Sequence, residues 1–326
     1  MAETPAIRNV MVTGATGFVG RAVVRELIAR GFKPICVVRN PARLEDQHRD
    51  LPPERFSAVV GSLHDRRALR RAADVSQAAI HLVGIILNRR LQRQTFRRIH
   101  VEGTENVLEA VTRARIRRFV HMSALGTRPD APSAYHRTKW QAEEAVRRSG
   151  LDWTVFRPSV IHGPYGELMQ LLKRFVCGLL PPVIPCFGQG TARVQPVFVK
   201  DVAHCFVESL LRPQTVGQIF SLGGPQAYTW IELYETCRRI MPKAKRWKPI
   251  VSIPVPLAEL LALVSAPPMA VGELLFPPLR KFRFDRGQVA MAQEDSVCDP
   301  TAAEKAFDIR MRSFEEELSA YADLIP

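Results

Sequence analysis

A tyrosine and a lysine stand four residues apart in the segment Tyr135-His-Arg-Thr-Lys139. On a helix this spacing is about one turn, so both side chains lie on the same face. A nearby ammonium group lowers the pKa of a phenol, and the phenol can then exchange a proton with a carbonyl or an alcohol while a hydride moves. The spacing therefore predicts Tyr135 as a general acid, with Lys139 lowering its pKa and holding a nicotinamide ribose.

A glycine-rich segment, Thr13-Gly-Ala-Thr-Gly-Phe-Val-Gly20, lies directly between an expected strand and an expected helix. Glycine permits a tight turn and lets a phosphate approach the backbone. The start of the helix offers free N–H groups and the positive end of its dipole to a pyrophosphate. In this context the pattern predicts a dinucleotide site, the alternative being a turn without a ligand. The predicted contacts here are Gly14, Thr16, Gly17, Phe18, Val19 and Gly20.

The second expected strand ends in Val37-Val-Arg-Asn40, with no acidic residue at its tip. An acid there usually holds a ribose 2′-hydroxyl, whereas an arginine holds a 2′-phosphate. Arg39 therefore favours NADP(H) over NAD(H), with Arg21 as a second candidate and simple solvation of Arg39 as the alternative. The remaining predicted cofactor contacts are Ser62, Leu63, Val83, Gly84, Tyr135, Lys139 and Pro158.

Strands and helices alternate in the first part of the chain. Apolar strands are expected over 8–13, 34–38, 56–60, 78–83, 118–122 and 153–156, and helices over 18–31, 65–73, 93–113 and 134–149. This order predicts an α/β fold with a doubly wound parallel (Rossmann) sheet covered on both faces. We expect a dinucleotide-binding domain over residues 1–157.

After residue 157 the pattern changes, and prolines become frequent. Helices are expected near 166–178, 200–212, 229–241, 256–265 and 313–323, and short strands near 194–199 and 217–222. We expect residues 158–326 to form a smaller α+β substrate lid on the carboxyl edge of the sheet. Residues 159–165 and the loop 185–196 would line the substrate cleft.

The 46 basic and 32 acidic residues give a net charge of +14, and nearly all of the excess lies in residues 1–150. Arginine runs follow the third and fourth expected strands. They indicate a solvated helix face or, alternatively, a surface for an acidic protein or anionic lipid. Nucleic acid is not expected, because aromatic residues do not interleave with the arginines. Repulsion across this face argues for a monomer or a weak oligomer.

Residues 250–279 are strongly apolar, but Pro267, Pro268, Glu259 and Glu273 interrupt the run, so a membrane-spanning helix is not expected. Two short helices over a groove, or peripheral contact with a bilayer, are the interpretations.

The six cysteines form no Cys-x-x-Cys pair and the histidines lack ligand spacing, so no metal site is expected. A reduced, cytoplasmic location fits best, and a position at the periphery of a membrane is the alternative.

The glycine-rich loop and the Tyr135/Lys139 pair resemble the short-chain dehydrogenase/reductase superfamily, in its extended and atypical branches. Further segments resemble one subgroup, which contains the nucleotide-binding accessory subunit of respiratory complex I (alpha-subcomplex subunit nine) and its bacterial relatives. The resemblance covers about residues 8–320. These segments begin at His81, His100, His121, Arg157 and Gln195 and read His-Leu-Val-Gly, His-Val-Glu-Gly-Thr-Glu-Asn, His-Met-Ser-Ala-Leu-Gly, Arg-Pro-Ser-Val-Ile-His-Gly-Pro and Gln-Pro-Val-Phe-Val-Lys-Asp-Val-Ala.

The chain departs from the extended branch at several positions. The resemblance implies a catalytic hydroxyl just after the fifth strand, where Ser123 or Ala124 stands, and Ser123 is the candidate. His100 replaces a usual asparagine, Ser62 replaces a frequent acid, and Val194 stands where an arginine grips a sugar-nucleotide diphosphate. Cofactor binding is therefore better supported than turnover, and a sugar-nucleotide substrate is disfavoured.

The resemblance implies an NADP(H)-binding oxidoreductase that acts through Tyr135 and Lys139 on a small carbonyl or alcohol, or on a quinone-like or lipid-like substrate. The alternative is a non-catalytic NAD(P)H-binding accessory or assembly protein related to complex I. A nucleic-acid or regulatory binder is a third interpretation, and it predicts strongly salt-dependent binding.

Overall fold

The computed structural model describes residues 7–88, 94–264 and 286–326. Its centre is a parallel sheet of seven strands in the order β11-β6-β5-β4-β1-β2-β3. The chain reverses its direction of winding between β1 and β4, as the doubly wound prediction requires. The strands are β1 (Asn9–Thr13), β2 (Lys33–Val38), β3 (Ser57–Val60), β4 (Ala78–His81), β5 (Arg118–Met122), β6 (Asp152–Pro158) and β11 (Gln218–Leu222).

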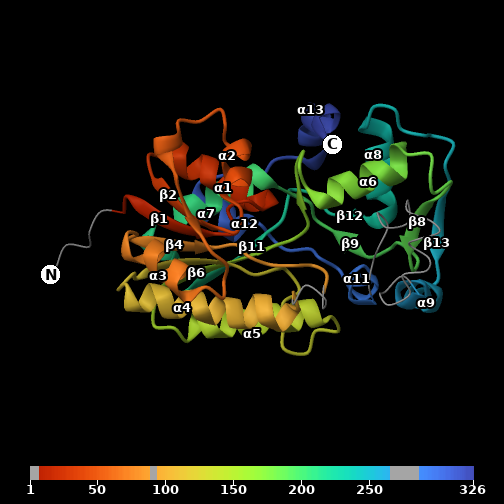
Figure 1. Ribbon diagram of the computed structural model, residues 1–326. Coiled ribbons are helices and arrows are strands. Elements are labelled where there is room, and N and C mark those ends of the chain that lie inside the picture. The colour runs from red at the N-terminus through yellow and green to blue at the C-terminus, as the bar shows by residue number, and fades with distance from the viewer. Residues whose placement is uncertain (1–6, 89–93, 265–285) are drawn as a thin grey trace.

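Helices cover both faces of this sheet, as Figure 1 shows. One face carries α1 (Phe18–Ala29), α2 (Pro41–Gln47), α7 (Val199–Ser209) and α12 (Thr301–Phe307), and the other carries α3 (Arg66–Asp74), α4 (Gly103–Arg113) and α5 (Ala134–Arg147). Arg97–Glu102 form a π-helical turn ahead of α4. The predicted α/β fold class is confirmed, and the helix starts and ends agree with the apolar spacing to within a few residues.

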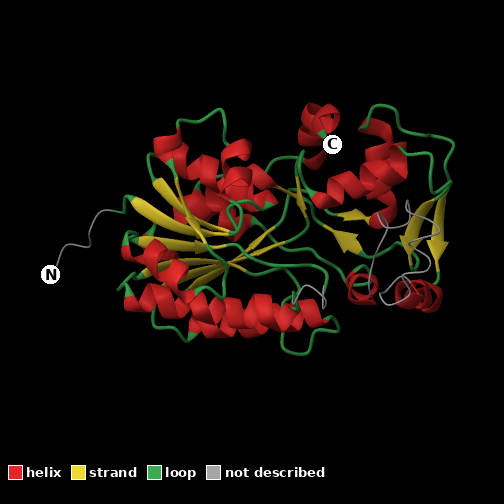
Figure 2. Ribbon diagram, viewed as in Figure 1, coloured by secondary structure: helices red, strands yellow, loops and turns green. Residues whose placement is uncertain are grey.

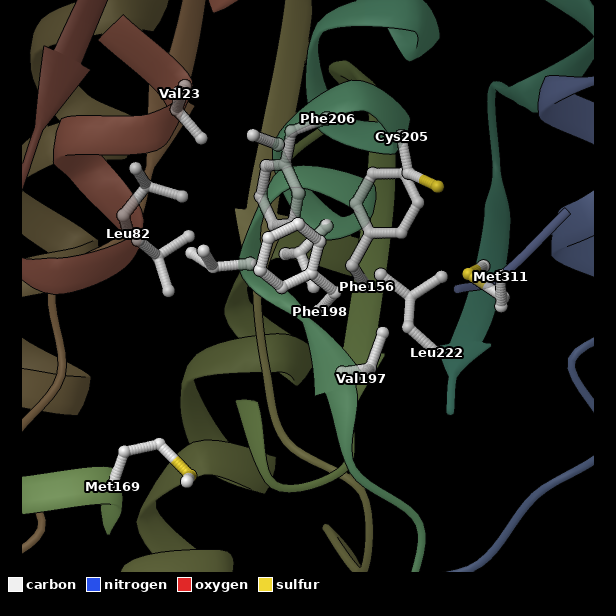
Figure 3. Packing of buried hydrophobic residues seen from close by; sticks show 14 of the residues in the cluster. Val23, Leu82, Phe156, Met169, Val197, Phe198, Cys205, Phe206, Leu222 and Met311 are labelled. Carbon is white, nitrogen blue, oxygen red and sulfur yellow. The ribbon is translucent and has the colours of Figure 1, made fainter. Parts of the chain in front are cut away.

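The central strands are buried on both sides, which explains their unbroken apolar runs. In β1, Val10 and Val12 point into the cluster under α1 and α7, whereas Met11 points into the cluster under α3 and α4. Figure 3 shows the first cluster, where Phe156 of β6 packs against Phe206 of α7 with ring centroids 4.5 Å apart.

The second part of the chain lies mostly beyond the carboxyl edge of the sheet, with its own short strands (Figure 2). They form three two-stranded sheets, β10-β7, β12-β9 and β13-β8. Their bounds are β7 (Ile161–His162), β8 (Ile184–Phe187), β9 (Arg193–Val194), β10 (Val197–Phe198), β12 (Tyr228–Thr229) and β13 (Ile250–Ile253). The helices here are α6 (Glu167–Cys177), α8 (Trp230–Ile240), α9 (Val255–Val264), α11 (Arg286–Met291) and α13 (Phe314–Tyr321).

The expected division at residue 157 does not coincide with the edge of the sheet. The 217–222 strand, assigned above to the lid, is β11; it pairs with β6 and extends the central sheet, with Phe220 beside Phe156. The 200–212 helix is α7, which packs on α1. The two parts are therefore interleaved, because the edge strand β6 offers backbone groups that β11 satisfies.

Only part of the apolar 250–279 segment falls within the described residues, as β13 and α9; residues 265–285 lie outside them. Within the described part of the chain, no helix is both long enough and apolar enough to cross a bilayer.

Candidate functional site

The glycine-rich turn joins β1 to α1 at the carboxyl edge of the sheet. Gly14 has a φ of +83°, which favours glycine. A Cβ on Gly20 would lie 2.0 Å from the Gly14 carbonyl oxygen, so the chain closes on itself here. Gly17 caps α1 without a side chain, which leaves the first N–H groups of the helix facing outward. The backbone thus forms a cradle suited to a pyrophosphate.

The remaining residues of the loop attach it to its surroundings. Val19, in the first turn of α1, is buried. The Thr16 carbonyl accepts a hydrogen bond of 3.2 Å from Gln47 of α2. The Phe18 ring lies so close to Gly163 that a Cβ there would be 3.1 Å from it. These contacts fix the loop between the sheet and the second part of the chain.

The two arginines predicted to meet a 2′-phosphate have different surroundings. Arg39 is exposed just beyond the tip of β2, next to β1 and its loop. Arg21 instead lies over the ring of Tyr165, 4.0 Å from its centroid. Arg39 therefore has the freer guanidinium, and Arg21 is already held by a cation–π contact.

The tips of β3 and β4 bring four predicted contacts to the same edge. After β3, the Ser62 hydroxyl accepts from the His64 N–H at 3.2 Å, and Leu63 is buried. After β4 come Val83 and Gly84. A Cβ on Gly84 would lie 3.2 Å from Lys139 Nζ, so this glycine opens the space in front of the lysine.

Tyr135 and Lys139 share one face of α5, whose start is capped by Ser133. Lys139 is fully buried, and its Nζ donates to the Met122 carbonyl at the end of β5 over 2.7 Å. This bond draws α5 to the tips of β4 and β5 and places both side chains at the edge that carries the glycine loop.

The expected lowering of the tyrosine pKa is not found in this structure. Burial raises the pKa of Tyr135 to about 12, while burial lowers the pKa of Lys139 to about 8 against the opposing effect of Glu143. Desolvation of each charged form dominates here. At neutral pH the phenol is protonated and the lysine is mostly charged.

A shell of histidines surrounds this pair, and the sequence did not predict it. His100, in the π-helical turn, accepts from the Ile85 N–H at 3.0 Å and bonds Thr138 at 2.9 Å, with its ring edge-on to Tyr135 at 5.4 Å. His81 bridges Thr13 and Thr104. Burial, reinforced by the charge of Lys139, lowers the pKa of His81 to about 3 and that of His100 to about 2. Both rings are neutral.

An ion pair between Glu143 and Arg157 lies one helix turn beyond Lys139. Glu143 follows Lys139 by one turn of α5 and is fully buried. Arg157 of β6 binds its carboxylate with two hydrogen bonds, of 3.0 and 2.6 Å. The Tyr-x-x-x-Lys-x-x-x-Glu spacing indicates that Glu143 lies on the same helix face as Lys139, because residues four apart share a helix face.

Other predicted residues are less central. Ser123 is buried after β5, and its hydroxyl bonds Thr127 at 3.3 Å, not Tyr135. Pro158 ends β6 next to this loop. His162 does not face a cleft, because it packs between aromatic rings and bonds the Tyr321 hydroxyl at 3.0 Å. In the described part of the chain, no cluster of three or more potential metal ligands occurs.

These residues fit a nicotinamide dinucleotide. The glycine cradle accepts a pyrophosphate, Arg39 stands free at the tip of β2, and the glycine in front of Lys139 leaves room for a ribose.

Comparison with known proteins agrees with this geometry. A family described as NAD(P)H-binding matches residues 14–168. The chain is 34% identical over 254 residues to a ceramide reductase from Caulobacter vibrioides, covering 78% of this chain and 76% of that protein. It is 27% identical over 300 residues to subunit 9 of the NADH dehydrogenase [ubiquinone] 1 alpha subcomplex from Arabidopsis thaliana, covering 89% and 71%.

Among solved structures, the fold resembles a dTDP-glucose 4,6-dehydratase from Streptomyces venezuelae with NAD bound. Its TM-score is 0.72 at 21% identity, covering 97% of this chain and 96% of that one. The family match and the 34% identical relative confirm the resemblance to the short-chain dehydrogenase/reductase superfamily. The chain belongs to the NAD(P)H-binding short-chain dehydrogenase/reductase family, in the branch that includes these homologues of complex I subunit nine and ceramide reductase.

Proposed function

We propose that the protein is an NADP(H)-dependent oxidoreductase that interconverts a carbonyl and an alcohol on a small lipid-like or quinone-like substrate. The observation that carries the proposal is the bond from Lys139 to the Met122 carbonyl. It brings the Tyr135/Lys139 pair to the edge of the sheet that also holds the glycine cradle. An oxidoreductase of this family needs both features within reach of one cofactor.

In the proposed reaction, bound NADPH would supply the hydride. Gly14, Gly17 and Gly20 would hold the pyrophosphate, Arg39 would hold the 2′-phosphate and Lys139 would hold the ribose. As the C–H bond forms, the carbonyl oxygen takes the proton of the Tyr135 hydroxyl and becomes the alcohol.

The tyrosinate left behind is stabilised by the Lys139 ammonium and takes a proton from solvent. Because the pKa of Lys139 is about 8, this support is lost as the pH rises above that value. Reduction should therefore slow on the alkaline side of pH 8.

The substrate class rests on two observations. The name of the Caulobacter relative, a ceramide reductase, favours a lipid carbonyl. Val194, which is buried, stands where sugar-nucleotide enzymes need an arginine. In this proposal the second part of the chain acts as the lid over the substrate.

Tyr135→Phe tests the catalytic role. It should abolish turnover of a long-chain ketone or quinone panel and leave NADPH affinity within about twofold, measured by cofactor fluorescence. Retention of turnover would contradict the proposal. Gln141→Ala, which changes an exposed residue of the same helix away from the shared face, is the control and should keep activity.

The cofactor preference is tested separately by thermal-shift titration with NADPH and NADH. NADPH should stabilise the protein at a lower concentration than NADH does. Arg39→Ala should weaken NADPH binding by roughly tenfold and change NADH binding little, because it removes a charge-assisted contact with the 2′-phosphate. Equal shifts of the melting temperature with both nucleotides in the wild type would contradict the role proposed for Arg39.

A non-catalytic accessory protein is the second candidate, and one observation favours it. His100 replaces the family's asparagine and, with Phe96, packs edge-on against Tyr135 at 5.4 and 6.1 Å. The complex I subunits are related examples. This alternative predicts that no substrate is turned over and that removal of NADPH lowers the melting temperature.

A further inference from the structure

Three large apolar side chains are exposed on two loops far from the candidate site. Leu179 is 71% exposed, Leu180 64% and Trp247 63%. The loops are residues 178–183, after α6, and residues 242–249, before β13. Together they are called the apolar loop pair. Side chains of this size gathered at one place on a surface mark an interaction site.

Hydrogen bonds hold residues 242–249 against the end of α6, where the other loop begins. Lys248 is fully buried, and its Nζ donates to the carbonyls of Phe175 at 2.6 Å and Gly178 at 3.2 Å. The Lys245 N–H donates to the Val176 carbonyl at 2.8 Å. Directly after the loops, β8 and β13 pair in parallel, at one end of the molecule in Figure 1. Leu179 and Trp247 adjoin the bonded residues Gly178 and Lys248, so their side chains stand on neighbouring segments of the chain.

The charge of this surface has a single sign. Residues 178–183 and 242–249 contain no acidic residue, while Lys243 and Arg246 are exposed and Lys245 is half-buried. Leu257 and Leu260 of α9 are also exposed, but α9 follows β13 and carries Glu259, so it is not part of the apolar loop pair. Leucines beside a tryptophan, with lysine and arginine at the rim, are the composition that lies in a membrane interface.

We propose that the apolar loop pair docks the protein on a bilayer that contains anionic phospholipid. The leucines and the Trp247 ring enter the boundary between headgroups and acyl chains, and Lys243 and Arg246 meet the phosphates. The proposal differs from docking through the arginines of α3, which lie beside the smaller side chains of Val60 and Val75. It does not rest on turnover, since binding is measured without substrate.

The test is co-sedimentation of the full chain with vesicles of phosphatidylcholine alone or with one third phosphatidylglycerol. The wild type should bind the anionic vesicles at least tenfold more tightly. Leu179→Ser with Leu180→Ser should weaken this binding by tenfold or more, because two large apolar groups no longer leave water. Lys243→Gln with Arg246→Gln should weaken it by about fivefold for each charge removed.

Two controls match these changes elsewhere on the surface. Leu211→Ser removes a leucine that is 52% exposed at the end of α7, and Arg67→Gln with Arg70→Gln removes two exposed charges from α3. Both should bind vesicles like the wild type. NADPH affinity should be unchanged in every variant, which shows that each has folded.

Three outcomes overturn the proposal. One is a wild type that ignores both vesicles, and another is an unchanged affinity in the double-serine variant. The third is loss of binding in the α3 variant, which moves the contact to the arginine face. Binding to soluble polyglutamate that resists the serine changes, without vesicle binding, points instead to an acidic protein.

Discussion

Among the residues that the structure describes, two lysines are fully buried, and they have different roles. Lys139 donates to one carbonyl, has Glu143 one helix turn behind it, and faces a glycine in front. Lys248 donates to two carbonyls at the end of α6 and joins two loops. Burial lowers the pKa of both. A buried lysine therefore indicates function only where space is left beside it, as Gly84 leaves it for Lys139.

The largest expected difference between the two lysines is in catalysis. Lys139→Met should lower turnover of any substrate that depends on Tyr135 by about 100-fold to 10,000-fold, because the tyrosinate loses its counter-charge. Steady-state kinetics with NADPH at saturation measure this. Lys248→Met should keep the turnover of each folded molecule; an equal loss in both variants would erase the distinction.

Lys139 should also couple stability to pH. Its folded pKa of about 8 is below the ordinary value of 10.5, so between these values the unfolded chain binds the extra proton. The free energy of unfolding should therefore rise from pH 8 to pH 10.5, by up to about 3 kcal/mol relative to Lys139→Met. Urea unfolding of both proteins across this range, without cofactor, measures the difference, and parallel curves would show that Lys139 does not titrate there.

Lys248 should matter for folding. Lys248→Met removes the two hydrogen bonds that Lys248 donates and should cost about 2 kcal/mol of unfolding free energy. Lys243→Met, exposed on the same loop, is the control and should change little. Denaturant melts compare the two, and equal stability would mean that Lys248 does not brace the loops.

The smallest effect is expected at the ion pair behind Lys139. Glu143→Gln removes the carboxylate that favours the charged lysine, so the alkaline fall of the pH–rate profile should move to lower pH. Glu144→Gln, which breaks surface pairs with Arg147 and Arg148 on the same helix, should leave the profile in place. Identical profiles would remove Glu143 from the site.

The structure brings the predicted residues together and adds partners that the sequence did not indicate. The glycine loop, Arg39, Gly84 and the Tyr135/Lys139 pair meet at one sheet edge, as expected. Their partners were not foreseen, because the contact of His100 with Tyr135 depends on a π-helical turn.

The fold shows the same limit. The Pro41 helix was not expected, since seven residues carry little periodicity, although Asn40 caps it. The prediction that the strand at 217–222 belongs to the lid is wrong, because apolar character indicates that a strand exists but not which sheet it joins.

The sequence by itself determined the strand–glycine–helix unit, the alternation that makes a doubly wound sheet, and the shared face of Tyr135 and Lys139. These features are local, since spacing and residue type along one segment specify them. Only the tertiary structure decided that Arg157 pairs with Glu143, that β11 completes the sheet, and that Lys248 ties its loop to the end of α6. Such contacts join distant segments, and burial and hydrogen-bond satisfaction in the folded chain select them.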